Sequence, residues 1–103
     1  MAEKNYAGKT LEVNDEGYLL DHMQWSKEIA KEIAKEEGID LSEMHFAVLE
    51  YLREKYIADE QLSIRKVGKS GIVDIKGLYK LFPGGPLKKS SRIAGIAKPS
   101  SCV

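Results

Sequence analysis

Glycine and proline residues divide the chain into short segments, and this division constrains the fold more than any other feature of the sequence. Between these residues, apolar side chains recur at helical spacing, as in the stripe from His45 to Tyr56. Gly38 and Gly95 follow two of the helical patterns, and Pro83 stops a third because the residue before a proline avoids helical geometry. We therefore expect several short helices that pack on one another.

Residues that favour helix starts stand before the apolar stripes: Ser26, Ser42, Asp74 and Pro86. A further short helix is expected to end near Gly68 or Gly71. The helix after Asp74 is expected to carry its apolar residues on one face: Ile75, Leu78, Tyr79 and Phe82. Residues 6–13 alternate around a glycine and predict a β-hairpin, with a second turn at 14–17. The predicted fold class is mainly α with an N-terminal β-hairpin.

The length of 103 residues allows one domain, with 43% apolar and 31% charged residues as in soluble globular proteins. The net charge of zero conceals a division. Residues 1–60 hold 15 acidic and 7 basic residues, a net charge of −8, and residues 61–103 hold 1 acidic and 9 basic residues, a net charge of +8. The basic half indicates an anionic partner, an anionic group on the tail or an acidic protein surface, unless it pairs with the acidic body.

Several classes of protein are excluded by composition. The longest strictly apolar run, Phe46–Leu49, is far too short to cross a membrane, and residues 1–6 lack the pattern of a secretory signal. A single cysteine, Cys102, excludes an internal disulfide and any site built from several cysteines. We expect a cytoplasmic protein with no cofactor and no metal.

The last residues, 96–103, show no periodicity and predict a mobile C-terminal arm that follows a domain of residues 1–95. Cys102 lies seven residues after Gly95, a reach of roughly 23 Å at ~3.3 Å per residue. A thiol near cations such as Arg92 and Lys98 ionises more readily, and the thiolate is the nucleophile. A tethered thiol of this kind suits a carrier that hands a group from one enzyme to another.

The other candidate sites are weaker. His22 and His45 lack partners at a metal-ligand spacing, and we expect His45 to be a hydrogen-bonded core residue. The segment 68–71 lacks the spacing of a phosphate-binding loop. The alternative function is DNA binding by a basic helix-turn-helix, formed by two predicted helices within residues 62–81.

Three segments towards the C-terminus form a specific pattern: Leu78–Pro86, Arg92–Pro99 and the ending Cys102-Val103. This pattern closely resembles the DsrC/TusE family of sulfur carriers, which includes the gamma subunit of dissimilatory sulfite reductase. Weaker similarity extends upstream through Glu16-Gly17-Tyr18-Leu19, Trp25, Leu41-Ser42-Glu43, His45-Phe46, Leu52-Arg53-Glu54, Tyr56 and Ile64-Arg65.

The resemblance implies a small orthogonal bundle of helices and a cysteine, Cys102, that carries persulfide or sulfite-derived sulfur into the active site of a partner. In one branch of the family the partner is a siroheme-containing sulfite reductase. In the other branch the sulfur moves through a relay towards 2-thiouridine in tRNA. Either role makes the chain a co-substrate of other enzymes rather than a stand-alone enzyme.

The chain departs from part of the family at one position. Two-cysteine members place a second cysteine eleven residues before the last one, where this chain has Ser91. A serine hydroxyl forms no disulfide, so the resemblance implies a single-thiol relay. The cations Lys88, Lys89, Arg92 and Lys98 are expected to favour an anionic persulfide if the arm folds back.

Overall fold

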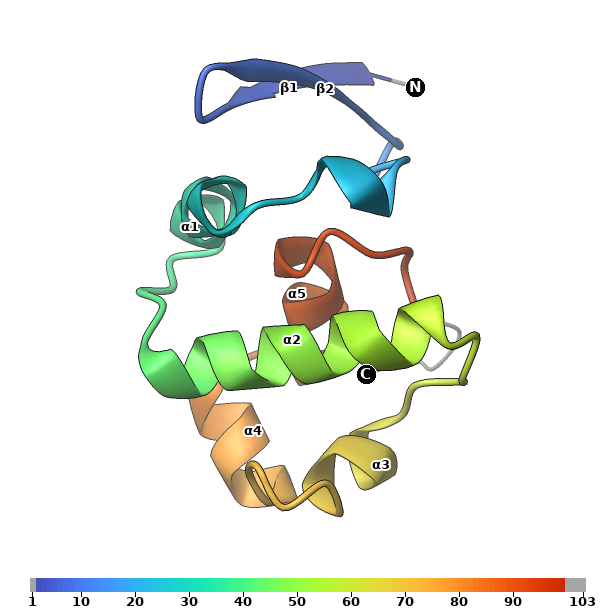
Figure 1. The fold of residues 1–103 in the computed structure, drawn as a ribbon. Helices are drawn as coiled ribbons and strands as arrows, with labels where there is room; N and C mark the ends of the chain where they lie inside the picture. The colour runs from blue at the N-terminus through green and yellow to red at the C-terminus, as the bar shows by residue number, and fades with distance from the viewer. Residues whose placement is uncertain (1, 100–103) are drawn as a thin grey trace.

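The structure is a computed structural model, and it describes residues 2–99 of the chain. The elements follow the order β1 (Ala2–Tyr6), β2 (Lys9–Val13), the 3-10 helix η1 (His22–Gln24), α1 (Lys27–Glu36), α2 (Glu43–Ile57), α3 (Ile64–Gly68), α4 (Ile75–Leu81) and α5 (Pro86–Ile93). Figure 1 shows the hairpin at one end of the molecule and the five α-helices below it. This arrangement confirms the predicted mainly α fold with an N-terminal hairpin.

The hairpin is antiparallel and pairs Ala2 with Val13 at its open end and Tyr6 with Lys9 beside the turn. Its first strand begins at Ala2, four residues earlier than the sequence pattern predicts. The turn between the strands contains Gly8 at φ +78°, a conformation that glycine adopts without strain. Tyr6 is buried at the end of β1, on the side of the hairpin that faces α1. The two strands therefore cover α1 rather than standing alone.

Side-chain caps begin the helices where the sequence predicts them. The Ser26 hydroxyl accepts a hydrogen bond from the Ile29 N–H, and the Asp74 carboxylate accepts one from the Gly77 N–H. A further cap, which the sequence analysis did not identify, is Ser63 at the start of α3. Each cap satisfies an N–H group that the helix itself leaves without a partner. The predicted helix starts at residues 26, 42, 74 and 86 are confirmed.

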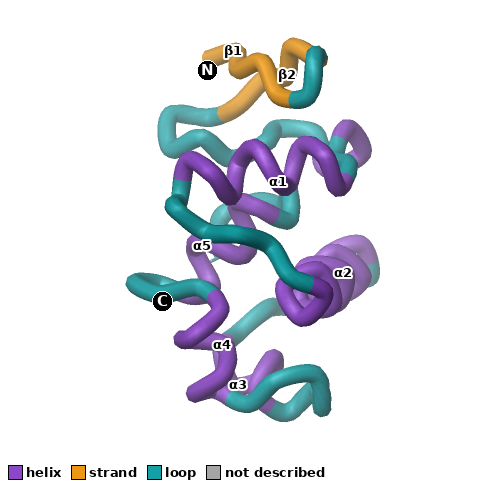
Figure 2. The backbone as a smooth tube through the Cα atoms, turned by 90° about the vertical axis from the view of Figure 1, so that its left-hand side faces the viewer, coloured by secondary structure: helices purple, strands orange, loops and turns teal. Residues whose placement is uncertain are grey.

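The helices cross at steep angles around α5. In Figure 1 α1 is seen nearly along its axis while α2 runs across the view, and Figure 2, turned by 90°, shows the reverse. The short helix α5 contacts α1, α2 and α4. The predicted orthogonal bundle is therefore confirmed, and α5 lies at its centre.

The apolar face predicted for α4 is partly wrong. Leu78 and Phe82 are fully buried as expected, but Ile75 and Tyr79 are each 44% exposed. Leu81, which was not assigned to this face, is partly buried against the core. Because α4 packs along one side with residues 78, 81 and 82, its buried stripe is rotated away from the predicted one.

His45 is the buried, hydrogen-bonded core residue that the sequence predicts. Its Nδ1 atom accepts a hydrogen bond from the Ser42 N–H at 3.0 Å, and its Nε2 atom lies 2.9 Å from the Leu81 carbonyl oxygen. The ring also meets Phe82 edge-on, with 5.1 Å between centroids. Since Nδ1 accepts, Nε2 carries the proton and donates it to the carbonyl. One imidazole thus caps α2 and fastens its start to the end of α4.

We expect His45→Ala to lower the free energy of unfolding by about 3 kcal/mol, because it leaves the Leu81 carbonyl unpartnered and opens a cavity. Denaturant unfolding followed by circular dichroism measures this change. Met44→Ala, at the neighbouring exposed position, is the control and should stay within about 0.5 kcal/mol of the wild type. Equal effects of the two substitutions would contradict this account of His45.

Candidate functional site at the end of helix α5

The predicted site residues do not form one cluster in the part of the chain that the structure describes. Cys102 lies outside the described residues. Lys88 is exposed on α5, whereas Ser91, on the same helix, is fully buried. Arg92 and Lys98 each pair with an acidic residue of the N-terminal half. Their contacts show which of these side chains could pair with an external anion and which stabilise the fold.

Arg92 joins α5 to α1 and to the turn that follows the hairpin. Its guanidinium donates to the Glu36 carboxylate, to the Glu37 carboxylate at 3.1 Å and to the Gly17 carbonyl at 3.2 Å. The Tyr6 hydroxyl donates to the same Glu36 carboxylate at 3.0 Å. A side chain at Gly17 would place its Cβ 2.8 Å from the guanidinium, so a glycine is required there. Most donors of Arg92 are therefore occupied by its own domain.

The buried position of this cluster changes the titration of its members. Burial raises the pKa of Tyr6 to about 12, with a further contribution from its hydrogen bond to Glu36. Burial alone would also raise the pKa of Glu36, but the hydrogen bonds from Arg92 and Tyr6 outweigh it and the pKa is lowered. For Arg92, burial is likewise outweighed by Glu36, and its pKa is raised. The stable form of the cluster thus has Glu36 and Arg92 ionised and Tyr6 neutral.

Lys98 occupies a more open position. Its ammonium group lies 2.9 Å from the Glu16 carboxylate, on the turn that follows the hairpin, and both side chains are substantially exposed. An exposed pair of this kind contributes at most about 1 kcal/mol. Lys98 can therefore exchange this partner for another anion at little cost, which Arg92 cannot do.

Ser91 is fully buried in α5, and its hydroxyl has no hydrogen-bond partner within residues 2–99. The neighbouring Ser90 is equally buried, but its hydroxyl donates to the Leu87 carbonyl at 3.2 Å. An unpartnered buried hydroxyl destabilises the folded state. Position 91 therefore holds a polar group that the described part of the surrounding core does not satisfy.

Two residues that the sequence analysis did not propose for the site lie at the end of α5. The Trp25 indole donates from Nε1 to the Ile93 carbonyl at 2.7 Å, and Arg53 donates from Nη1 to the Ala94 carbonyl at 2.9 Å. The sequence indicates Arg53 as a cation one residue after Leu52, at the edge of the apolar stripe of α2. The sequence does not indicate that Arg53 binds the Ala94 carbonyl, because residues 53 and 94 are distant in the chain.

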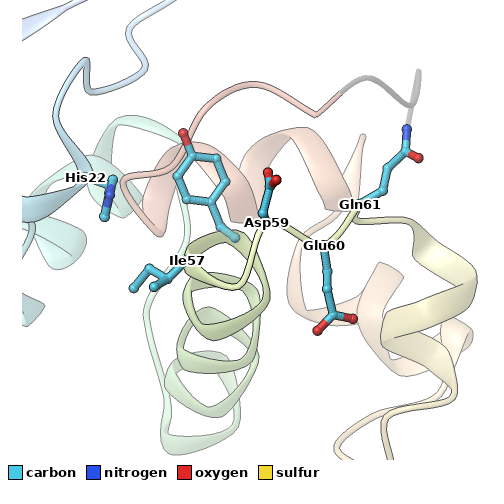
Figure 3. Close-up of a pocket in the computed structure, with 6 residues that line it drawn as sticks. His22, Ile57, Asp59, Glu60 and Gln61 are labelled. Atoms are coloured by element: carbon cyan, nitrogen blue, oxygen red, sulfur yellow. The ribbon is translucent and has the colours of Figure 1, made fainter.

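A shallow cavity of about 600 Å³ opens beside this region, at the C-terminal end of α2. Its lining residues, drawn in Figure 3, are His22, Tyr56, Ile57, Asp59, Glu60 and Gln61. His22 and Tyr56 meet edge-on with 5.4 Å between ring centroids, and the buried Nδ1 atom of His22 has no hydrogen-bond partner in the described part of the chain. Among residues 2–99, no three His, Cys, Asp or Glu side chains gather as metal ligands would.

The predicted pair of basic helices is present as α3 and α4, with five and seven residues. Gly68 packs against Ile75, where a Cβ atom would meet the isoleucine side chain at 2.6 Å. Lys66 is paired with Glu60. The comparisons with known proteins give no support to DNA as a partner, so the helix-turn-helix alternative is not retained. No helix in the described range combines the length and apolar character needed to cross a membrane.

The fold and the contacts at the end of α5 define a class of protein: a small orthogonal helical bundle whose C-terminal segment begins from a fixed position on the bundle. The family model described as "DsrC like protein" matches residues 5–103. The chain belongs to this DsrC family, as the sequence resemblance predicted.

Individual relatives agree with this assignment. Sulfurtransferase TusE of Escherichia coli strain K12 is 39% identical over 106 residues, covering 95% of this chain and 97% of the relative. The oxidized gamma-subunit of the dissimilatory sulfite reductase (DsrC) from Archaeoglobus fulgidus has a TM-score of 0.83 at 33% identity, with 99% and 100% of the two chains covered. DsrC of Allochromatium vinosum has a TM-score of 0.81 at 34% identity, with 98% and 97% covered.

The two adjacent serines of α5 give a matched test of the buried hydroxyl. We expect Ser91→Ala to leave the free energy of unfolding unchanged or to raise it by about 1 kcal/mol, because it removes an unsatisfied polar group. Ser90→Ala removes a satisfied hydroxyl and should lower the free energy by about 1 kcal/mol. Denaturant unfolding of both variants measures the difference, and the opposite order would show that Ser91 has a partner in solution.

The cluster around Arg92 predicts a pH dependence of stability. Because folding lowers the pKa of Glu36, its contribution is present above the pKa of the unfolded chain and is lost as the pH falls through the lower folded value. Glu36→Gln should therefore be less stable than the wild type at neutral pH, and the two should converge in acid. Glu50→Gln, at an exposed position of α2, is the control. A constant difference between wild type and Glu36→Gln at all pH values would refute the assignment.

Proposed function

We propose that the chain is a sulfur carrier and that Cys102 is the residue that holds the sulfur. The carrier role follows from membership of a family whose relatives include proteins named sulfurtransferase TusE and DsrC. The observation that supports Cys102 is that the family match extends through residue 103 and that this is the only cysteine in the chain. A sulfur-carrying thiol has no other candidate.

The transfer is a displacement between sulfur atoms. The Cys102 thiolate attacks the outer sulfur of a donor persulfide, the donor's sulfur–sulfur bond breaks, and the donor leaves as a thiolate. Cys102 then carries a persulfide. An acceptor thiolate attacks the outer sulfur of that persulfide and releases the Cys102 thiolate. One sulfur–sulfur bond forms and one breaks in each step, so no external oxidant or reductant is consumed.

Among the supporting residues, Lys98 is the cation best placed to assist. Its exposed pairing with Glu16 costs little to break, whereas the positive charge of Arg92 is balanced by Glu36 and Glu37. We assign Arg92 to the integrity of the base from which the arm extends, and Lys98 to contact with the anionic persulfide or with a partner. Lys88, exposed on α5, can add to the positive field without a direct contact.

The division of the chain follows from this role. The body of residues 1–95 anchors the arm of residues 96–103. The first residue of the arm, Ile96, packs in the core, and its backbone N–H donates to the Ser91 carbonyl. Ser91 supports the relay branch of the family over the two-thiol branch, because a serine cannot close a disulfide with Cys102. The partners are then donor and acceptor proteins of a sulfur relay that ends in tRNA thiolation.

Sulfur loading tests the proposal directly. After incubation with a persulfide donor and removal of excess reagent, the intact protein should gain the mass of one sulfur atom, and Cys102→Ser should gain none. A thiol moved by one position, in Ser101→Cys combined with Cys102→Ser, should accept sulfur from a small donor but transfer it poorly to a protein acceptor. Absence of a mass gain in the wild type, or a gain that persists in Cys102→Ser, would overturn the assignment.

A further inference from the structure

The chain leaves α5 through contacts made by side chains from two other parts of the fold. Trp25, in the segment between η1 and α1, donates to the Ile93 carbonyl, and Arg53, on α2, donates to the Ala94 carbonyl. These are consecutive carbonyls at the C-terminal end of the helix, where no intrahelical partner exists. We refer to Trp25 and Arg53 together as the bracket.

The two bracket residues also hold each other. The Arg53 guanidinium lies 4.4 Å from the centre of the Trp25 ring, a cation–π contact, and its Nη2 atom donates to the His22 carbonyl at 3.0 Å. No ion pair between Arg53 and a carboxylate occurs within residues 2–99. Burial lowers the pKa of Arg53. A half-buried cation without an acidic partner destabilises the folded state. The contacts of Arg53 with two carbonyls and an aromatic ring therefore indicate that the geometry at this point must be fixed.

The next residue of the chain is shaped to fit the bracket. Gly95 adopts φ +71°, and a Cβ atom there would lie 2.5 Å from the Trp25 ring. Any other residue would push the chain away from the indole and strain its own backbone. Ile96 then turns into the core, where it is almost completely buried. Residues 93–96 are consequently held from several sides.

The holding contacts weaken immediately afterwards. Ala97 is exposed, and Lys98 is held by the surface ion pair with Glu16. Figure 1 shows this segment running from the end of α5 towards the C-terminal end of α2. The backbone is therefore held firmly as far as Ile96 and weakly at residues 97 and 98. Cys102 lies six residues after Ile96 in the sequence.

We propose that Trp25 and Arg53 are positioning residues that fix the direction in which the arm carrying Cys102 leaves the body. The benefit of a fixed direction rests on the proposed function, whereas the contacts of Trp25 and Arg53 are observed independently of it. A thiol on a directed arm explores less space than one on a free tail, so less entropy is lost when it enters a partner. The bracket acts on the carbonyls of residues 93 and 94 and does not touch the reacting sulfur.

One tryptophan and one cysteine make the test possible without further labels in the chain. An energy acceptor attached to Cys102 reports its distance from Trp25 through time-resolved tryptophan fluorescence, with each variant measured also without the acceptor. We expect the wild type to give a narrower distance distribution than a variant that lacks the bracket contacts. Arg53→Met, which keeps the stem but loses the donors and the charge, should broaden the distribution, and Arg53→Lys should restore it in part.

Two controls separate positioning from stability. Val67→Ala, at a buried position of α3, lowers stability without touching the bracket and should leave the distribution unchanged. Arg65→Met, at an exposed position, controls for the loss of an arginine. An unchanged distribution in folded Arg53→Met, or an equal broadening in Val67→Ala, would overturn the inference. The measurement needs no sulfur, so failure of sulfur loading at Cys102 would count against the proposed function alone.

Discussion

The Arg92 guanidinium, paired with the carboxylates of Glu36 and Glu37, fastens the central helix to the N-terminal part of the fold. It joins α5, the central helix, to the end of α1, and through Gly17 it also holds the turn that leads from the hairpin. The Tyr6 hydroxyl completes the cluster from the hairpin itself. Removing a half-buried guanidinium would leave two carboxylates and a carbonyl facing each other, so the layers at this end of the molecule depend on one side chain.

The same interaction explains part of the charge division between the two halves of the chain. Arg92, Lys98 and Lys66 all belong to the basic half, and each pairs with a glutamate of the acidic half. The tertiary structure thus neutralises some of the charge that the linear sequence separates. Other cations of α3 and α4, namely Arg65, Lys76 and Lys80, remain exposed on the surface.

A carrier needs a fixed body and a reactive group that can leave it, and the end of α5 meets both needs over a few residues. Buried contacts hold the chain through Ile96, and a single exposed ion pair holds Lys98. Burial and hydrogen bonding are costly to undo, whereas an exposed ion pair is not. The hold on the backbone therefore weakens after Ile96, where burial ends, and the proposed sulfur-carrying residue Cys102 follows this point in the sequence.

Local signals in the sequence predict the starts of α1, α2, α4 and α5, the hairpin, the core role of His45 and the family, because caps, turns and apolar spacing are local and the terminal motif is specific. The packing of the helices sets what those signals do not: which face of α4 is buried, the lack of a partner for the Ser91 hydroxyl within residues 2–99, and the pairing of Arg92 with glutamates. It also brought Trp25 and Arg53 to the end of α5. These outcomes join residues that lie far apart in the chain, and no local pattern records which distant carbonyl or carboxylate a side chain will meet once the helices cross.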